Sequence, residues 1–415
     1  MKLKKYKLGE ILDVTRGTSL IGEYYATEGE YIRLTCGNFD YQNNCFKENK
    51  SKDNLYYVGD FKPEFLMEEG DIITPLTEQA IGLLGSTAII PESGKYIQSQ
   101  DIAKIVCKED LLDKDFAFYL ISSTIVKQQL SAAAQQTKIR HTSPDKIKDC
   151  TVWIPELTEQ KRIGKLLRTL DYKIGLNRAI NQNLEEMAKQ LYDYWFVQFD
   201  FPDENGRPYK SSGGKMVWNE NLKREIPEIF EWCALKDFIQ LEDSKRIPLS
   251  SKERLDKKGI YPYYGATGIM DYVNDYIFDG DYLLLAEDGS TSDANGNPIV
   301  QYIWGKNWVN NHAHIILPQT DGFILYTYQL LKNIPAKMIE TGSIQKKISQ
   351  ENLLAYKIIL PIQRLIKYYC EIISPLWEQR KNNIEEILAL TKQRDELLPL
   401  MMNGQVSVNS DLSDD

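Results

Sequence analysis

The sequence predicts an α+β fold with two similar domains, each built on a twisted and mostly antiparallel sheet. Two long helices are expected to separate these domains and to pair as an antiparallel coiled coil. Two observations carry this prediction: an unusually long amphipathic segment at residues 158–196, and a second copy of the same arrangement later in the chain. Two copies are too few for a solenoid, so each is expected to be a globular domain followed by its own helix.

The first long segment has the composition and periodicity of a helix that packs along another helix. Residues 158–196 contain no proline and many good helix formers. Their apolar residues recur over about five heptads, as in a coiled coil. At about 1.5 Å per residue the helix would be about 55–60 Å long. The expected contact positions are Ile163, Leu170, Asn177, Leu184 and Leu191, with companions three positions further on at Leu166, Lys173, Ile180, Met187 and Tyr194.

The second copy follows at one constant offset. This offset places Ser143 on Ser349, and it places the strand ending Ile154–Pro155 on Leu360–Pro361. The chain therefore repeats a variable region, a short strand that ends in proline, and a long helix.

The second helix is expected over residues 362–403, with a kink or break at Ser374–Pro375. Asn177 and Asn383 would help to set the register of the helix pair rather than to stabilise it. Two unrelated buried amphipathic helices are the simpler alternative. The contact positions expected in the second helix are Asn383, Leu390 and Leu397.

Composition shifts and the repeat together suggest the limits of the parts. The connection between the two copies is rich in Gly, Pro, Asn and Ser, and the end of the chain is acidic and expected to be disordered. The expected parts are domain 1 at 1–153, the first helix at 154–200, a linker at 201–231, domain 2 at 232–360, the second helix at 361–404 and the tail at 405–415.

The composition is that of an ordinary folded protein, with 42% hydrophobic and 26% charged residues. The six cysteines are scattered, the chain opens with MKLKKYKLGE, and no apolar run is long enough for a membrane span. These features predict a cytoplasmic protein with no membrane partner. The net charge of −9 argues weakly against a nucleic-acid partner, although a local basic face would be sufficient.

The sequence offers no catalytic site. It lacks the glycine-rich lysine loop of nucleotide hydrolases, and Ser212–Lys215 resembles that loop only superficially. Asn297–Val300 lacks the second proline and the aromatic residue of an aminomethyltransferase motif. His312 and His314 would share a strand face, but no cysteine or carboxylate cluster at ligand spacing supports a metal. We therefore expect no catalytic residue and no metal ligand.

A recognition pattern remains. Hydroxyl, amide and cationic side chains occupy equivalent places in both copies, just before the strand that ends in proline, and they suit phosphate contacts and hydrogen bonds to base edges. An ordinary solvated loop is the alternative for either copy alone. The candidate DNA-binding residues are Lys138, Arg140 and His141 in the first copy, Ser343, Gln345, Lys346 and Lys347 in the second, and Thr77, Gln79, Lys245 and Arg246 in other loops.

These features resemble the specificity subunit of type I restriction–modification systems over nearly the whole chain. The resemblance rests on Ile154–Pro155 followed by Thr158–Ile163, on Leu176–Asn181, on Met216–Glu220, and on Gly342–Ser349 in the second copy. The first copy departs from the family pattern, because it has Gln136–Lys138 where the family often has Gly-Ser/Thr.

The resemblance implies two target-recognition domains, each of which reads one half of a bipartite site in double-stranded DNA. It implies that the helices dock two methyltransferase subunits, and that restriction subunits with translocase activity join this core. S-adenosylmethionine and ATP with magnesium would then be bound by those partners, and no cofactor by this chain. Two other functions remain open: a self-contained methyltransferase–specificity fusion, and a coiled-coil scaffold that binds no nucleic acid.

Overall fold

The computed structural model of the chain describes most of the sequence, and its contacts divide the chain into two compact units. One unit comprises Met1–Arg178 and Glu385–Asp415, and the other comprises Ala179–Ile384. Each unit therefore contains a part of each long helix. No helix of the described part of the chain is long and apolar enough to cross a membrane. The described residues are 2–50, 53–78, 82–133, 140–342 and 346–408.

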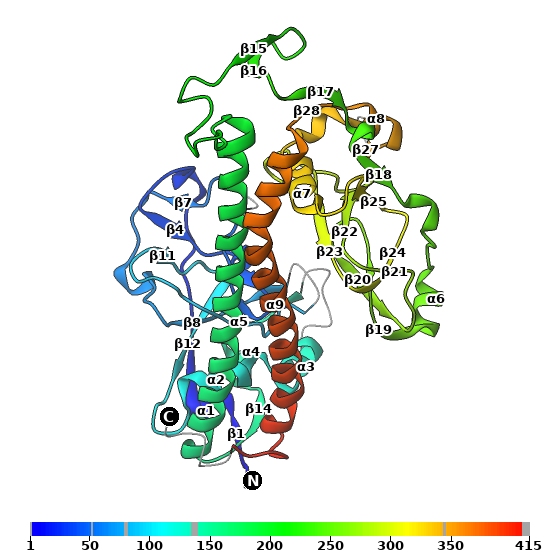
Figure 1. Cartoon of the computed structure of the whole chain (residues 1–415). Coiled ribbons are helices and arrows are strands. Elements are labelled where there is room, and N and C mark those ends of the chain that lie inside the picture. Colours follow the sequence, from blue (N-terminus) through cyan, green and yellow to red (C-terminus); the bar gives the residue numbers. More distant parts are fainter. Residues whose placement is uncertain (1, 51–52, 79–81, 134–139, 343–345, 409–415) are drawn as a thin grey trace. The chain divides into compact units, whose positions relative to one another are not determined.

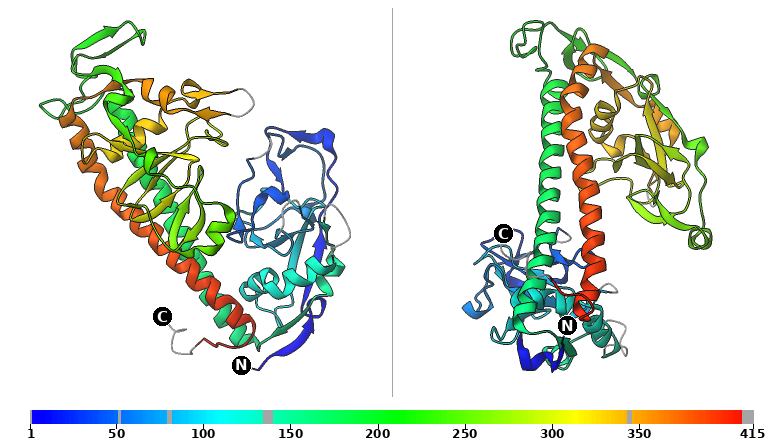
Figure 2. Two further views of the ribbon diagram at one scale, coloured as in Figure 1. Left: turned by 90° about the vertical axis from the view of Figure 1, so that its right-hand side faces the viewer. Right: turned by 60° about the horizontal axis from the view of Figure 1, so that its bottom comes forward.

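The two long helices, α5 (Leu157–Tyr192) and α9 (Gln363–Met402), lie side by side (Figures 1 and 2). Their relative direction follows from their contacts: as the residue number on α5 rises, the residue number of its contact on α9 falls. The predicted antiparallel pairing is thus confirmed. Successive contacts join Asp171 to Arg394, Asn177 to Glu386, Asn181 to Asn383 and Ala188 to Tyr369.

The predicted break in the second helix is wrong, because α9 continues through Ser374 and Pro375. A proline inside a helix leaves the carbonyl four residues earlier without its hydrogen bond. Here Pro375 and that earlier residue, Glu371, are both exposed, so water can satisfy the free carbonyl. The first helix ends in a π-helical turn, Asp193–Val197.

The helix contact face contains the expected main positions but different companions. Ile163, Leu170, Asn177 and Asn383 are buried, and Leu184, Leu191, Leu390 and Leu397 are half-buried. Of the expected companions, Leu166 is half-buried and Lys173 forms an ion pair with Glu386 of α9 at 3.3 Å. Ile180, Met187 and Tyr194 are exposed, so those three positions are wrong. The companions lie four residues further on, at Leu167, Ile174, Asn181 and Ala188. A heptad alternates steps of three and four, and the spacing of the main positions does not reveal which step comes first.

The first unit contains two four-stranded sheets, in the orders β10-β8-β12-β2 and β11-β4-β7-β3, with antiparallel pairing except between β11 and β4. Its larger core is formed by α1, α2, β2 and β12 against the beginning of α5 and the end of α9. The elements are β1 (Lys4–Lys7), α1 (Leu8–Ile11), β2 (Leu12–Arg16), β3 (Tyr25–Ala26), β4 (Tyr31–Arg33), β5 (Phe39–Asp40), β6 (Cys45–Phe46), β7 (Tyr56–Tyr57), β8 (Ile72–Pro75), β9 (Thr77–Glu78), β10 (Ala88–Ile89), β11 (Tyr96–Ile97), β12 (Ile102–Cys107), α2 (Lys114–Ser122), α3 (Thr124–Ala133), β13 (Arg140–His141), α4 (Pro144–Lys148) and β14 (Thr151–Ile154).

The second unit also contains two four-stranded sheets, β18-β25-β22-β23 and β20-β19-β24-β21, again antiparallel except for one pair, β19 and β24. Its core packs α7 against both long helices. The elements are β15 (Met216–Asn219), β16 (Arg224–Pro227), β17 (Glu231–Ala234), β18 (Ile239–Leu241), α6 (Ser251–Asp256), β19 (Lys258–Tyr264), β20 (Ile269–Val273), β21 (Phe278–Asp279), β22 (Tyr282–Ala286), β23 (Val300–Ile303), β24 (Lys306–Val309), β25 (Ala313–Pro318), α7 (Ile324–Lys332), β26 (Glu340–Thr341), β27 (Lys347–Ile348), α8 (Gln350–Ala355) and β28 (Lys357–Leu360).

The repeat seen in the sequence recurs element by element. Ser143 caps α4 by accepting a hydrogen bond from the Lys146 backbone N–H, and Ser349 caps α8 through the equivalent Asn352 N–H. Each short helix leads into the strand that ends in Pro155 or its counterpart. In both copies this strand pairs with the first strand of its own region, β1 with β14 and β17 with β28. The two ends of each globular region therefore lie side by side.

One polar arrangement ties each globular region to the helices. In the first unit, Asp171 of α5 accepts hydrogen bonds from the Tyr119 hydroxyl of α2 at 2.5 Å and from Arg394 of α9 at 2.7 Å. In the second unit, Glu185 of α5 accepts from the Tyr328 hydroxyl of α7 at 2.8 Å. It also pairs with Lys332 of α7 at 2.5 Å and with Arg380 of α9 at 3.3 Å. One carboxylate thus joins three helices in each unit.

Arg394→Ala is expected to lower the free energy of unfolding of the chain by about 1–3 kcal/mol, because it removes the cation from a mostly buried pair and leaves Asp171 underpaired. Lys392→Ala is the matched control, since the Lys392–Glu396 pair is exposed and should contribute less than about 0.5 kcal/mol. Denaturant unfolding of both variants measures the difference. Equal effects of the two substitutions would show that the Asp171 cluster does not stabilise the unit.

Candidate DNA interface

In the first copy, the structure brings three of the predicted contact residues together. Strand β13 pairs antiparallel with β9, which places Arg140 opposite Glu78 and His141 opposite Thr77. The Thr77 hydroxyl lies 3.4 Å from His141 Nδ1 and donates to Asp101 Oδ1 at 3.2 Å. Two further candidate contact residues, Lys138 and Gln79, lie outside the described residues.

The Arg140 guanidinium is paired with an acid that sequence reasoning missed. Its Nη1 lies 3.4 Å from Glu78 Oε2 and donates to the Ser131 hydroxyl at 3.1 Å. The Glu78 side chain is only 6% exposed, whereas that of Arg140 is 34% exposed. The cation therefore lies at the surface over a buried carboxylate.

The second copy repeats this arrangement with lysines. Strand β27 pairs with β26. The backbone of Lys347 also forms an isolated antiparallel β-bridge with the backbone of Asp288. Lys346 Nζ lies 2.9 Å from Glu340 and Lys347 Nζ lies 3.0 Å from Glu287. Both ammonium groups are about half exposed, while both carboxylates are mostly buried. Ser343 and Gln345 lie outside the described residues.

The two remaining candidates occupy different environments. Lys245 is exposed and forms an ion pair with Glu242. Arg246 is mostly buried, and its Nη1 donates to Glu287 at 2.7 Å and to the Ala313 carbonyl at 2.8 Å. The Lys245 side chain is therefore accessible from solvent, whereas that of Arg246 is bound inside the domain.

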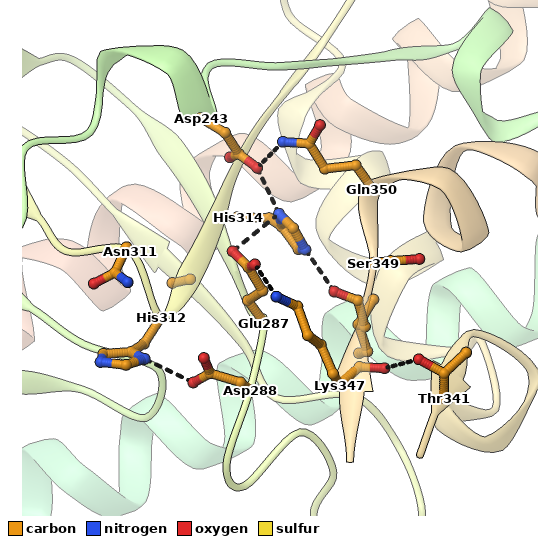
Figure 3. A network of polar contacts seen from close by, with 12 residues as sticks. Asp243, Glu287, Asp288, Asn311, His312, His314, Thr341, Lys347, Ser349 and Gln350 are labelled. Atoms are coloured by element: carbon orange, nitrogen blue, oxygen red, sulfur yellow. Dashed lines mark hydrogen bonds and ion pairs between the residues drawn. The ribbon is translucent and has the colours of Figure 1, made fainter. Parts of the chain in front are cut away.

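A buried polar network lies behind β27 (Figure 3). His314 of β25 points one ring nitrogen at Asp243, with Nδ1 2.5 Å from Oδ2, and the other at the Ile348 carbonyl, 2.8 Å from Nε2. Asp243 also accepts from the Gln350 side chain at 2.6 Å. Glu287 lies between this group and Lys347, so the network reaches the candidate contact strand.

The pKa values of the network follow from its contacts. Burial alone lowers the pKa of His314, but hydrogen bonds to Asp243 and Ile348 outweigh it and raise the pKa above its ordinary value of 6.5. Burial alone raises the pKa of Asp243, and the hydrogen bonds that it accepts from His314 and other N–H groups lower it overall. For Glu287, Arg246 and Lys347 outweigh burial and likewise lower the pKa. All these shifts favour the charged forms.

The expectation that His312 and His314 share a strand face is wrong, because β25 begins at Ala313 and the two histidines have different partners. The His312 ring lies 2.7 Å from Asp288 and is half exposed, whereas His314 is buried with Asp243. Asp243, Glu287 and His314 have potential metal-ligating atoms that lie within 4.8 Å of one another. Sequence reasoning missed this cluster of two carboxylates and an imidazole. Asp243 and His314 are far apart in the sequence, and no local pattern links them. Arg246 and Lys347 supply the cations in this cluster.

Comparisons with known proteins agree on one family. A family model described as the type I restriction modification DNA specificity domain matches residues 2–186 and 227–387. The type I restriction enzyme MjaIX specificity subunit of Methanocaldococcus jannaschii is 25% identical over 333 residues, which cover 75% of this chain and 73% of that protein. The putative type I restriction enzyme specificity subunit S.HindORF215P of Haemophilus influenzae is 33% identical over 131 residues, 32% of this chain and 33% of that protein.

A solved structure has the same fold. The S subunit of the type I restriction–modification system from M. genitalium superposes with a TM-score of 0.59 at 18% identity, and the match covers 97% of this chain and 96% of that one. Neither the methyltransferase fusion nor the scaffold without nucleic acid corresponds to this family. Because the family model matches well over half of the sequence, the chain belongs to the specificity subunits of type I restriction–modification systems, which recognise the DNA target within the restriction enzyme complex.

Proposed function

We propose that residues 1–153 and 232–360 are two target-recognition domains, and that each reads one half of a bipartite site in double-stranded DNA. The contact surface of the first is the β9–β13 edge, and that of the second is the β26–β27 edge. One observation carries the proposal: both repeats place a surface cation over a buried glutamate, directly before a serine-capped short helix. Cations at equivalent places suit phosphate contacts that set the position of each domain on DNA.

The partners follow from the same proposal. The long helices dock two methyltransferase subunits, and restriction subunits with translocase activity join that core. S-adenosylmethionine and ATP with magnesium are bound by these partners, and no cofactor by this chain. The six cysteines are free, which supports a cytoplasmic location.

Lys346→Ala and Lys347→Ala are expected to weaken DNA binding by the assembled methyltransferase complex. Each lost phosphate contact should reduce the slope of log affinity against log salt by roughly one unit. Arg140→Ala should do the same from the other domain. Binding titrations at several salt concentrations, with duplexes altered in one half-site at a time, measure these effects.

Lys357→Ala is the matched control, because Lys357 is an exposed lysine of the same domain on β28 rather than β27. It changes the net charge by the same amount and should leave the salt slope unchanged. If Lys346→Ala and Lys347→Ala matched this control in affinity and slope, the β26–β27 edge would not be the contact surface.

A further inference from the structure

The His314 ring is buried, and each of its two nitrogens lies within hydrogen-bond distance of an oxygen atom. Its side chain is 1% exposed, and both ring nitrogens face oxygen atoms, of Asp243 and of the Ile348 carbonyl. A carbonyl oxygen can only accept a hydrogen bond, so Nε2 must donate. A neutral imidazole has a single N–H, so the contact at Nδ1 then needs either an imidazolium or a protonated carboxyl group.

The Asp243 contacts decide between these two possibilities. Its Oδ1 accepts from the Ile315 backbone N–H at 2.8 Å, and its Oδ2 accepts from Gln350 Nε2 at 2.6 Å. Arg246 also lies 3.4 Å from Oδ2. Groups that only donate, one of them cationic, favour the ionised carboxylate. His314 is therefore the proton carrier, as an imidazolium.

The charged His314 side chain joins two sheets of the second domain. His314 belongs to β25, an interior strand of the sheet β18-β25-β22-β23. Ile348, whose carbonyl accepts from His314, belongs to β27 and follows Lys346 and Lys347 directly. The Ile348 backbone N–H also donates to the Glu287 carbonyl at 2.8 Å, so this one residue is tied to the sheet by both its backbone groups.

We propose that His314 and Asp243 are positioning residues for DNA reading by the second domain: the charged imidazole, fixed by Asp243, anchors β27 through the Ile348 carbonyl and so sets where Lys346 and Lys347 meet the DNA. This inference rests on the proposed role of these lysines as DNA contacts. Loss of the ring charge removes one donor from the network. The Ile348 carbonyl or Asp243 is then left underpaired in a buried place, and β27 loosens.

The groups that face His314 determine its response to pH. Asp243 and Glu287 favour the imidazolium, whereas Arg246 and Lys347 oppose it. Since the folded-state pKa is raised above 6.5, the stabilisation by the charged ring is fully present below that pH. It is lost as pH rises through the raised value. Reading of the second half-site should thus weaken on the alkaline side.

The first domain is an internal control for this response. The chain has three histidines, and His141 is the one in domain 1, where it is exposed. Because His141 lies on the proposed β9–β13 contact edge, the comparison is made in a His141→Gln background. There, a loss of DNA reading that follows the titration of His314 should affect the second half-site and spare the first.

The first test is nitrogen-detected NMR of the ring signals in the full-length chain labelled at histidine. Three histidines give three sets of signals, assigned with His314→Gln and His312→Gln. The expected result is that His314 carries two ring N–H groups at about pH 6.5, the ordinary histidine pKa, at which a solvent-exposed imidazole is about half neutral. A single N–H on His314 at that pH would overturn the inference.

The second test is DNA binding by the assembled methyltransferase complex, with duplexes altered in one half-site. His314→Gln should reduce discrimination in the second half-site roughly tenfold, the scale of one lost charge-assisted hydrogen bond, and should leave the first half-site unchanged. His312→Gln is the matched control and should have no effect. Equal behaviour of the two variants would also overturn the inference.

The unaltered complex provides a readout that does not depend on how the variants fold. Its discrimination in the second half-site should fall with the same pH midpoint as the NMR titration of His314, and a pH-independent profile would contradict the inference. The proposed function has its own test, because silent Lys346→Ala and Lys347→Ala substitutions would refute the contact surface whatever the state of His314. If His314 is charged and the substitutions of Lys346 and Lys347 weaken DNA binding, but His314→Gln has no effect, only the positioning role is refuted.

Discussion

A matched insertion of four residues in both long helices is expected to lengthen the spacer of the recognised DNA site by about one to two base pairs. Both half-sequences should stay as they are. Four helical residues add about 6 Å and about 40° beyond one full turn. One base pair of DNA adds about 3.4 Å and about 35°. The α-helix and the DNA double helix are both right-handed, so the added length and the added rotation act in the same sense.

The structure determines where the insertions must go. The contacts divide the chain after Arg178 in α5 and after Ile384 in α9. Asn177 pairs with Glu386 on one side of this division, and Asn181 with Asn383 on the other. An insertion in α5 alone would shift one set of contacts against the other, whereas insertions in both helices keep both sets.

Genome-wide mapping of methylated sites measures the spacer for each variant. The control is a matched insertion of one residue, which rotates the contact face by about 100° and should abolish site-specific methylation. An unchanged spacer after the four-residue insertion would mean that the helices do not set the distance between the half-sites.

Exchange of residues 1–153 for the equivalent domain of a related specificity subunit is expected to replace one half of the methylated site completely and to leave the other half unchanged. The paired strands β1 and β14 place Lys4 opposite Ile154, so the first strand of the domain lies beside its single junction, just before α5. Gln160 of α5 holds the domain through backbone atoms, since it accepts from the Asp113 N–H and donates to the Leu111 carbonyl. A related domain supplies backbone groups of the same kind.

The reciprocal exchange, of residues 232–360, is the control for this experiment. Its junctions pair Glu231 with Leu360 in the same way, and it should replace only the other half of the site. Methylome sequencing of cells that carry each hybrid gives the result. A hybrid in which both halves of the site changed together would show that the two domains read DNA jointly.

The sequence by itself determined the repeat and the two long helices. These features depend on local propensity and on a hydrophobic period that continues over many residues, both of which can be seen without a fold. Ser143 and Ser349 illustrate that the repeat predicts individual equivalent residues, because each caps a short helix at the same offset. The contact positions Ile163 and Leu170 were also visible in this way, and both are buried.

Only the tertiary structure decided which side of α5 forms the contact face and which polar residues are buried and paired. Ala188 is buried against Tyr369 of α9 and the neighbouring Met187 is exposed, because α9 packs on one side of α5, and a period alone does not say which side that is. Arg246 and Lys347 looked alike in the sequence, yet one is buried and the other is half exposed over Glu287. Burial and charge pairing depend on residues far apart in the chain, and these become neighbours only once the chain has folded.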